Sequence, residues 1–255
     1  MIRGAITSNM DVAQVVLYAF FVFFAGLVFY LRREDRREGY PLESEVTGQR
    51  DDRGFLLIPT PKYFHRANGS IVAAPNFEVD PRPVNGAPVA RWAGAPLEPV
   101  GDPLLAGVGP GAYAMRADKP EQTYDGHNLL APLRVASNFA VASEDGDPIG
   151  LGVVGADRVV AGVVKDLWVD RSEGVLRYYE VELSDGRSIL LPVTFAKVDF
   201  QTKTIKVQAL FGSQFTNVPA LRNPDEITLL EEEKVTAYYG AGTLYATPAR
   251  TESLL

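Results

Sequence analysis

Carboxylates gather around one predicted turn in the second half of the chain. Asp166, Asp170 and Glu173 lie at the end of a strand-like segment and in the turn after it, and Arg177 follows in the next segment. Carboxylates that repel one another take up protons near neutral pH as a coupled set, so such a cluster can relay protons. Strand alternation places Arg177 on the face of Tyr179, which predicts a partly buried guanidinium beside these acids. From spacing alone, a solvated hairpin end remains the alternative.

A second short group, Asp125-Gly126-His127, has the residue types of half a metal site or of a surface proton relay, although an isolated run of this kind is usually a turn. His65 and His127 are the only histidines and there is no cysteine. A three-histidine zinc site, thiolate sites and disulfides are therefore excluded. GxSxG, HExxH, Walker A and EF-hand patterns are absent from the sequence.

The run GLGVVG at 150–155 matches the dinucleotide-binding fingerprint letter for letter. That chemistry needs a strand before the glycines and a helix after them, so that the pyrophosphate meets a helix N-terminus. Here the turn-like SEDGDP precedes the run, and β-branched residues follow it. The pattern therefore indicates glycines at turns or bulges of a β structure rather than a nucleotide site.

Composition narrows the class of protein further. The chain has 255 residues and a net charge of −7, with a pI near 5.0. A nucleic-acid-binding protein usually carries a basic patch and a high pI, so no nucleic-acid partner is expected. The length allows either one sizeable domain or a domain with an appendage.

The elements that position these groups begin with an apolar run, Val12–Leu31, in which Gln14 is the only strongly polar side chain. Twenty residues of helix measure about 30 Å, the thickness of a bilayer's hydrocarbon core. A signal peptide and a buried core helix are the alternatives, but no small-residue cleavage site follows the run. The positive-inside rule predicts an external N-terminus and a cytoplasmic remainder, because one arginine precedes the run whereas four follow it, namely Arg32, Arg33, Arg36 and Arg37.

After the apolar run, the composition of the chain changes twice. Residues 41–120 hold twelve of the eighteen prolines, together with aromatic residues such as Tyr63, Phe64 and Trp92, which are too apolar for a solvated, disordered tail. Repeated proline excludes long helices and central strands, so an irregular segment lying along another surface is expected. Four strand-like segments then follow, at 159–170, 175–183, 188–200 and 204–210, with Asp185-Gly186 as a hairpin turn.

A single helix is predicted near the C-terminus, at about residues 225–240. Asn223-Pro224-Asp225-Glu226 resembles a helix start, and either Gly240 or Gly242 is expected to end the helix. The acidic run 231–233 is interpreted as its solvated side.

At this point a family resemblance is visible. Residues 9–43 resemble the start of the H subunit of the purple-bacterial photosynthetic reaction centre, and REGYPLE (Arg37–Glu43) is the most specific piece. The likeness continues through GDPLLAGVGPGAY, AGVVKDLWVD and LLPVTFAKV, and it covers nearly the whole chain. The later part resembles the PRC-barrel fold.

The resemblance implies one transmembrane helix, a mainly β cytoplasmic domain forming a small antiparallel PRC-type barrel, and a C-terminal helix. Its segments would be a periplasmic 1–11, a transmembrane 12–31, an extended 32–120 on partner subunits and a barrel domain at 121–255. The subunit would be non-enzymatic and would sit in the bacterial inner (intracytoplasmic) membrane. It would cap the quinone side of the L and M subunits, stabilise their assembly and conduct protons to the secondary quinone.

No cofactor is expected on this chain itself. The partner subunits would hold bacteriochlorophyll, bacteriopheophytin, quinones and non-haem iron, with a light-harvesting ring and membrane lipids around the complex. A membrane-tethered PRC-barrel adaptor for another protein is the alternative, and an anchored enzyme using His65 or His127 is a third class.

Family roles carry over onto particular residues. The proton-path acids correspond to Asp170 and Glu173, with Arg177 as their charge partner, and the surface acid and histidine cluster corresponds to Asp125 and His127. The family's DGHGH run is shortened here to DGH, which weakens the expectation of a surface metal site. The residues expected to contact lipid headgroups or the M subunit are Tyr30, Arg32 and Tyr40.

Overall fold

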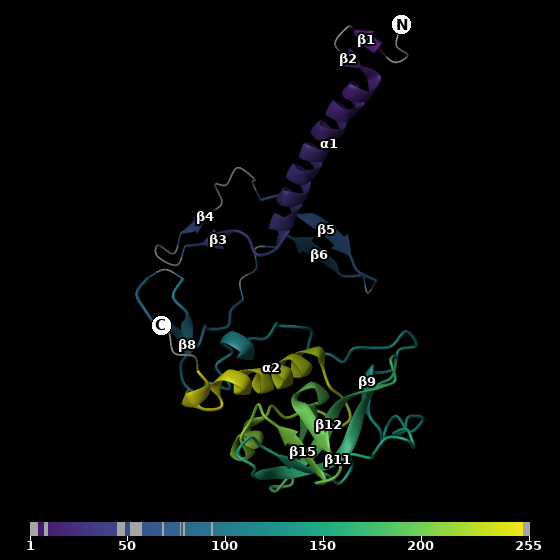
Figure 1. Ribbon diagram of the computed structural model, residues 1–255, viewed down its shortest axis with the longest axis vertical. Helices are drawn as coiled ribbons and strands as arrows, with labels where there is room; N and C mark the ends of the chain where they lie inside the picture. The colour runs from purple at the N-terminus through teal and green to yellow at the C-terminus, as the bar shows by residue number, and fades with distance from the viewer. Residues whose placement is uncertain are drawn as a thin grey trace. The chain divides into compact units, whose positions relative to one another are not determined.

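The structure, a computed structural model (Figure 1), describes residues 5–7, 10–44, 49–51, 58–67, 69–76, 78, 80–92 and 94–251. The chain forms two compact units, one of residues 1–82 with 92–94 and one of residues 83–91 with 95–255. Parts of the predicted segments 1–11, 32–120 and 121–255 lie outside the described residues. The predicted boundary after residue 120 stays a prediction.

The first unit contains one long apolar helix, α1 (Val12–Glu34). Asp11 caps its N-terminus, because the Asp11 carboxylate accepts a 2.7 Å hydrogen bond from the Gln14 amide. No residue of α1 is buried within the chain, and among the described residues it is the one helix long and apolar enough to cross a membrane. The predicted apolar helix is confirmed, and it continues a few residues past Leu31.

Short two-stranded hairpins make up most of the remaining first unit. Each has strands of two to four residues, in keeping with the frequent prolines. The antiparallel pairs are β1 (Ala5–Thr7) with β2 (Met10–Asp11), β3 (Leu42–Glu43) with β4 (Arg50–Asp51), and β5 (Lys62–His65) with β6 (Ile71–Ala74).

The second unit is built on a seven-stranded sheet. Six strands follow the order β13-β12-β11-β10-β15-β14, and β9 pairs with β11. All neighbours are antiparallel except β10 and β15. The strands are β9 (Leu130–Pro132), β10 (Gly152–Val154), β11 (Val160–Asp170), β12 (Val175–Leu183), β13 (Ser188–Pro192), β14 (Ala196–Asp199) and β15 (Thr204–Val207), and β7 (Gly86–Pro88) pairs separately with β8 (Leu97–Pro99).

The predicted mainly β domain with a helix near its C-terminus is confirmed, with one difference from the expected barrel. Among the residues that the structure describes, no hydrogen-bonded pairing joins β13 to β14, so the sheet stays open. The segment predicted as one strand at 188–200 is divided by a 3-10 turn, Val193–Phe195, between β13 and β14. Pro192 precedes this turn and, lacking an amide hydrogen, cannot donate a ladder bond.

Turns at both ends of β12 follow the sequence signals. Residues 171–174 form the turn after β11, and Gly174 has a φ of 68°. Asp185-Gly186 joins β12 to β13, with Gly186 at a φ of 82°. Glycine adopts this left-handed region without steric cost, so the predicted Asp-Gly hairpin is confirmed.

The GLGVVG run lies in β structure, as the flanking residues indicated. Gly152–Val154 form β10, and the next regular element is strand β11, not a helix. Gly150 has a φ of 84°, and the pairing register between β10 and β11 shifts between Val153 and Val154. Because no helix N-terminus follows the glycines, the geometry of a dinucleotide site is absent from this part of the chain.

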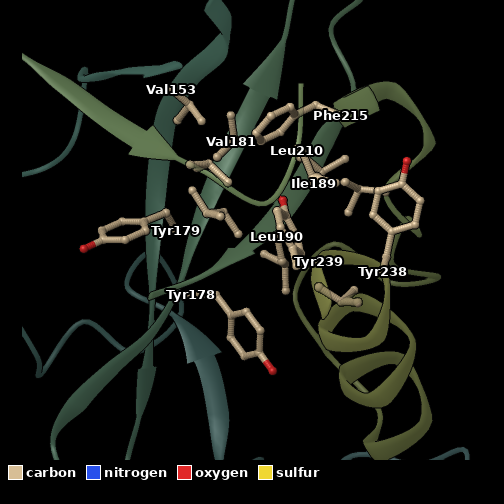
Figure 2. Packing of buried hydrophobic residues seen from close by; sticks show 14 of the residues in the cluster. Val153, Tyr178, Tyr179, Val181, Ile189, Leu190, Leu210, Phe215, Tyr238 and Tyr239 are labelled. Carbon is tan, nitrogen blue, oxygen red and sulfur yellow. The ribbon is translucent and has the colours of Figure 1, made fainter. Parts of the chain in front are cut away.

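The core lies between the sheet and helix α2 (Leu229–Tyr245). Figure 2 shows side chains of the strands and of α2 meeting in one cluster. Tyr239 of α2 is fully buried, and its ring stacks on Phe195 at 5.6 Å and meets Phe215 edge-on at 6.2 Å. Such aromatic pairs add about 0.5–1.5 kcal/mol beyond the burial of their area.

Helix α2 differs from the prediction at both ends. It begins at Leu229 with Thr228 as N-cap, and Glu231 completes a capping box with Thr228. Glu231 is therefore buried, so the interpretation of the whole 231–233 run as a solvated side was wrong. Gly240 and Gly242 lie inside the helix rather than at its end. A Cβ on Gly242 would stand 2.4 Å from the carbonyl oxygen of Ala209, so close packing explains this glycine.

Candidate functional site

Asp170 is buried at the end of β11, where it holds the turn to β12. It is 5% exposed, and its Oδ1 accepts hydrogen bonds from the amides of Ser172 at 2.9 Å and Glu173 at 3.1 Å. An aspartate that accepts from amides two and three residues later closes an Asx-type turn. The Asp170 carboxylate is therefore held at a protected position, and Glu173 is an exposed residue of the same turn.

Arg177 does not occupy the partly buried position that strand alternation predicted. Along β11 and β12, Trp168 pairs with Tyr178 and Val169 pairs with Leu176, which leaves Arg177 as the extra residue of a bulge. A bulge interrupts the two-residue alternation, and Arg177 is exposed as a result. Its role as charge partner of the acids stays a prediction.

Asp125 and His127 lie on an exposed loop that folds as a tight turn. The Thr123 amide donates to the His127 carbonyl at 2.8 Å, and the Gly126 amide donates to the Thr123 carbonyl at 3.0 Å. The His127 Nε2 is 3.8 Å from Asp125 Oδ2. The pKa of Asp125 is lowered, chiefly because the Thr123 hydroxyl donates to its carboxylate, with smaller contributions that include the positive charge of Arg171.

These two segments, which are more than forty residues apart in the sequence, meet beside the sheet. Leu130 of β9 pairs with Asp170 of β11, and the Arg171 amide donates to the Leu129 carbonyl at 2.9 Å. An open hollow of about 690 Å³ lies between them. Its polar lining comes from both segments and includes Thr123, Asp125, His127, Asn138, Arg171 and Ser172. The structure thus brings the acid and histidine loop next to the turn that Asp170 caps.

Asp166 belongs to a different cluster from the one predicted. It is 8% exposed and lies near the middle of the sheet, where Arg134 Nη1 donates to Asp166 Oδ2 at 2.8 Å and to Glu180 Oε2 at 2.6 Å. Arg134 Nε also contacts Asp225 at 2.9 Å. We call Arg134, Asp166, Glu180 and Asp225 the Arg134 cluster. Grouping Asp166 with the acids of the turn was therefore wrong.

The Arg134 cluster joins four segments of the second unit through charge-assisted hydrogen bonds, namely the loop after β9, strands β11 and β12, and the loop before α2. Partial burial alone would lower the pKa of Arg134, but the carboxylates of Glu180 and Asp225 outweigh this effect and raise it. Trp168, fully buried, donates its indole N–H to Glu180 at 3.0 Å. Sequence reasoning missed this cluster because its members come from four distant segments, and the one available signal was an acid at position 180 within an apolar strand.

Glu232, a partly buried carboxylate on α2, contacts a tyrosine of the sheet. The Tyr178 hydroxyl donates to Glu232 Oε2 at 3.1 Å, and burial raises the pKa of Glu232. Burial also raises the pKa of Tyr178. The carboxyl is therefore held closer to its neutral form than a surface glutamate would be.

The residues predicted to contact lipid or a partner lie at the C-terminal end of α1. Tyr30 and Arg32 are exposed, with Arg32 Nη1 3.7 Å from Asp35. The guanidinium of Arg36 lies 5.1 Å from the centre of the Tyr40 ring. Their predicted contacts with lipid or the M subunit stay predictions. Within the described ranges, no three histidine, aspartate or glutamate side chains gather as metal ligands.

The fold and the site define a class of protein: among the described residues, a chain with one apolar helix long enough to cross a membrane and a mainly β domain that carries buried acids. The chain matches the family model of the photosynthetic reaction centre H-chain N-terminal region over residues 4–135, and that of the PRC-barrel domain over residues 141–214. It therefore belongs to the photosynthetic reaction centre H-chain family. In this family the H chain is a non-catalytic, non-pigmented subunit associated with the reaction-centre complex.

Proposed function

We propose that this chain caps the cytoplasmic quinone side of the L and M subunits, stabilises their assembly and conducts protons to the secondary quinone. The chain would sit in the bacterial inner membrane with its N-terminus in the periplasm, and the L and M subunits would hold the pigments, quinones and non-haem iron. A surrounding light-harvesting ring and bound lipids belong to the same proposal. Membership of the H-chain family supports the capping role.

The observation that carries the proton role is the buried Asp170 beside the hollow lined by Asp125 and His127. A quinone that receives two electrons in a low-dielectric pocket must also receive protons, because a buried anion without a partner is very costly. Freely entering water would weaken the electrostatics of such a pocket. A protected carboxylate, reached from solvent through the polar side chains of the surface loop, supplies protons without that opening.

The test is the proton-coupled second electron transfer to the quinone in the purified complex. We expect Asp170→Asn and Glu173→Gln each to slow this step tenfold or more, which corresponds to about 1.4 kcal/mol on the limiting barrier. Asp185→Asn is the matched control, because Asp185 also accepts from a turn amide, that of Arg187 at 3.0 Å, but at the other end of β12. Unchanged rates and pH dependence in both single variants and in the double variant would remove the proton role and leave only the scaffold.

The alternative, a tethered adaptor for a different protein, makes a distinct prediction for purification. If the detergent-solubilised chain isolates with bacteriochlorophyll absorption, the reaction-centre assignment is supported. A colourless partner in its place would favour the adaptor.

A further inference from the structure

The β5–β6 hairpin is fastened to the end of the apolar helix. Glu34, the last residue of α1, accepts a bidentate pair of hydrogen bonds from Arg37 at 2.8 and 2.9 Å and one from Lys62 Nζ at 2.5 Å. Arg37 Nη1 also donates to the carbonyls of Thr60 and Ala74, each at 2.8 Å. These contacts hold the beginning of β5 and the end of β6, so the open end of the hairpin is fixed at the helix terminus (Figure 1).

This attachment sets the depth of the hairpin relative to a bilayer. Glu34 lies three residues past Leu31, the last residue of the apolar run, which is about 5 Å along the helix axis. The headgroup layer on each side of a bilayer is about 5–7 Å thick. A helix that crosses the membrane therefore carries the first residues of β5 within the headgroup layer.

The side chains of the hairpin suit that layer better than they suit water. Tyr63 is 69% exposed, Phe64 is 51% exposed and Ile71 is 58% exposed. An isolated two-stranded hairpin is marginal in water, and nothing in the described part of the first unit forms a second layer over these side chains. Tyrosine is enriched where one side of a ring meets hydrocarbon and the other meets water.

The charges of the hairpin favour binding to an anionic lipid surface. The stretch 61–76 contains Lys62 and Arg66 and no acidic residue. Lys62 is paired with Glu34, and with Arg37 added these four residues carry a net charge of +2, although the whole chain carries −7. Lys62 also lies 5.8 Å from the centre of the Tyr30 ring at the same level of α1. Each lysine or arginine close to an anionic membrane surface contributes about 1 kcal/mol to binding.

We propose that the β5–β6 hairpin is a second membrane contact of this subunit, which lies in the headgroup layer of an anionic bilayer and is held there by the Glu34–Arg37–Lys62 clamp. The helix anchors the chain, and the hairpin fixes how the chain emerges from the bilayer. This contact goes beyond the capping and proton-conducting roles and does not depend on either of them.

The chain has no cysteine, so a single introduced cysteine can carry an environment-sensitive fluorophore. The full chain is placed in vesicles of phosphatidylcholine with roughly one third phosphatidylglycerol, with a nitroxide quencher near the top of the acyl chains. Labels at Tyr63→Cys and Ile71→Cys are compared with Val22→Cys within the span and with Gln201→Cys on an exposed turn of the β domain. We expect at least twofold stronger quenching at positions 63 and 71 than at position 201, and a loss of that excess in pure phosphatidylcholine.

Two further measurements make the proposal falsifiable. Glu34→Gln removes the carboxylate that joins Arg37 to Lys62, so we expect quenching at position 71 to fall toward the value at position 201. If this variant changes nothing, the clamp is not what holds the hairpin. The labelled chain is also assembled into the whole complex. Labels that lose lipid quenching there, or that match the Gln201 label throughout, would assign the hairpin to a protein partner or to water and overturn the proposal.

Discussion

Replacing Arg134 should be one of the most destabilising single changes in the β domain. Arg134→Met keeps much of the side-chain volume and removes the charge that faces Asp166 and Glu180, whose side chains are only 11% and 6% exposed. Removing one partner of a buried ion pair costs about 3–5 kcal/mol, because the remaining charge stays buried without compensation. Since the Arg134 side chain is 36% exposed and water can reach its place, we expect a value near the lower limit, about 3 kcal/mol.

The assay is urea unfolding of the full chain in detergent, followed by the fluorescence of Trp168. The chain has two tryptophans, so a Trp92→Phe parent leaves Trp168, which is fully buried and bonded to Glu180, as the reporter. With a slope of about 2 kcal/mol per molar urea, a loss of 3 kcal/mol lowers the midpoint by about 1.5 M. The matched control is Arg187→Met, whose pair with Asp185 is exposed and contributes about 0.5 kcal/mol.

A companion variant separates lost charge compensation from lost packing. Adding Glu180→Gln to Arg134→Met removes one of the two stranded carboxylates, so we expect part of the lost stability to return. The reasoning is refuted if Arg134→Met shifts the midpoint no more than Arg187→Met does. It is also refuted if the double variant is less stable than Arg134→Met alone.

Two other predictions concern α2. Gly242→Ala should destabilise the domain by about 1–3 kcal/mol, because the added methyl would stand 2.4 Å from the Ala209 carbonyl oxygen. Thr236→Ala, at an exposed position of α2, is the control. Equal urea midpoints for the two variants would contradict the close packing at Gly242. Burial raises the pKa of Glu232, so the folded state binds this proton more tightly than the unfolded state, and stability falls as the pH rises from the unfolded to the folded pKa. Glu232→Gln should therefore gain stability relative to the natural chain as the pH rises above the unfolded pKa of a glutamate, about 4. Urea midpoints measured as the pH rises through this value check the sign, and a constant difference would show that Glu232 titrates as it does in the unfolded chain.

The sequence alone predicted those features that depend only on residues close to one another in the chain. Twenty residues with Gln14 as the only strongly polar side chain form a bilayer-length helix without reference to the rest of the fold, and α1 follows this pattern. Asp185-Gly186 determines its turn through the φ preference of glycine, and Asp170 closes its turn through amides two and three residues away. The flanks of GLGVVG excluded a nucleotide site for the same reason, since the required strand and helix would be adjacent in the chain.

Only the tertiary structure decided which charges meet. Arg134 contacts acids 32 to 91 residues away, and no local pattern encodes contacts at such separations. A single bulge moved Arg177 to the surface, because one extra residue reverses the side of the strand that each later residue faces. Gly242 lies within α2 because the Ala209 backbone approaches it, a constraint that comes from packing and that helix propensity does not contain.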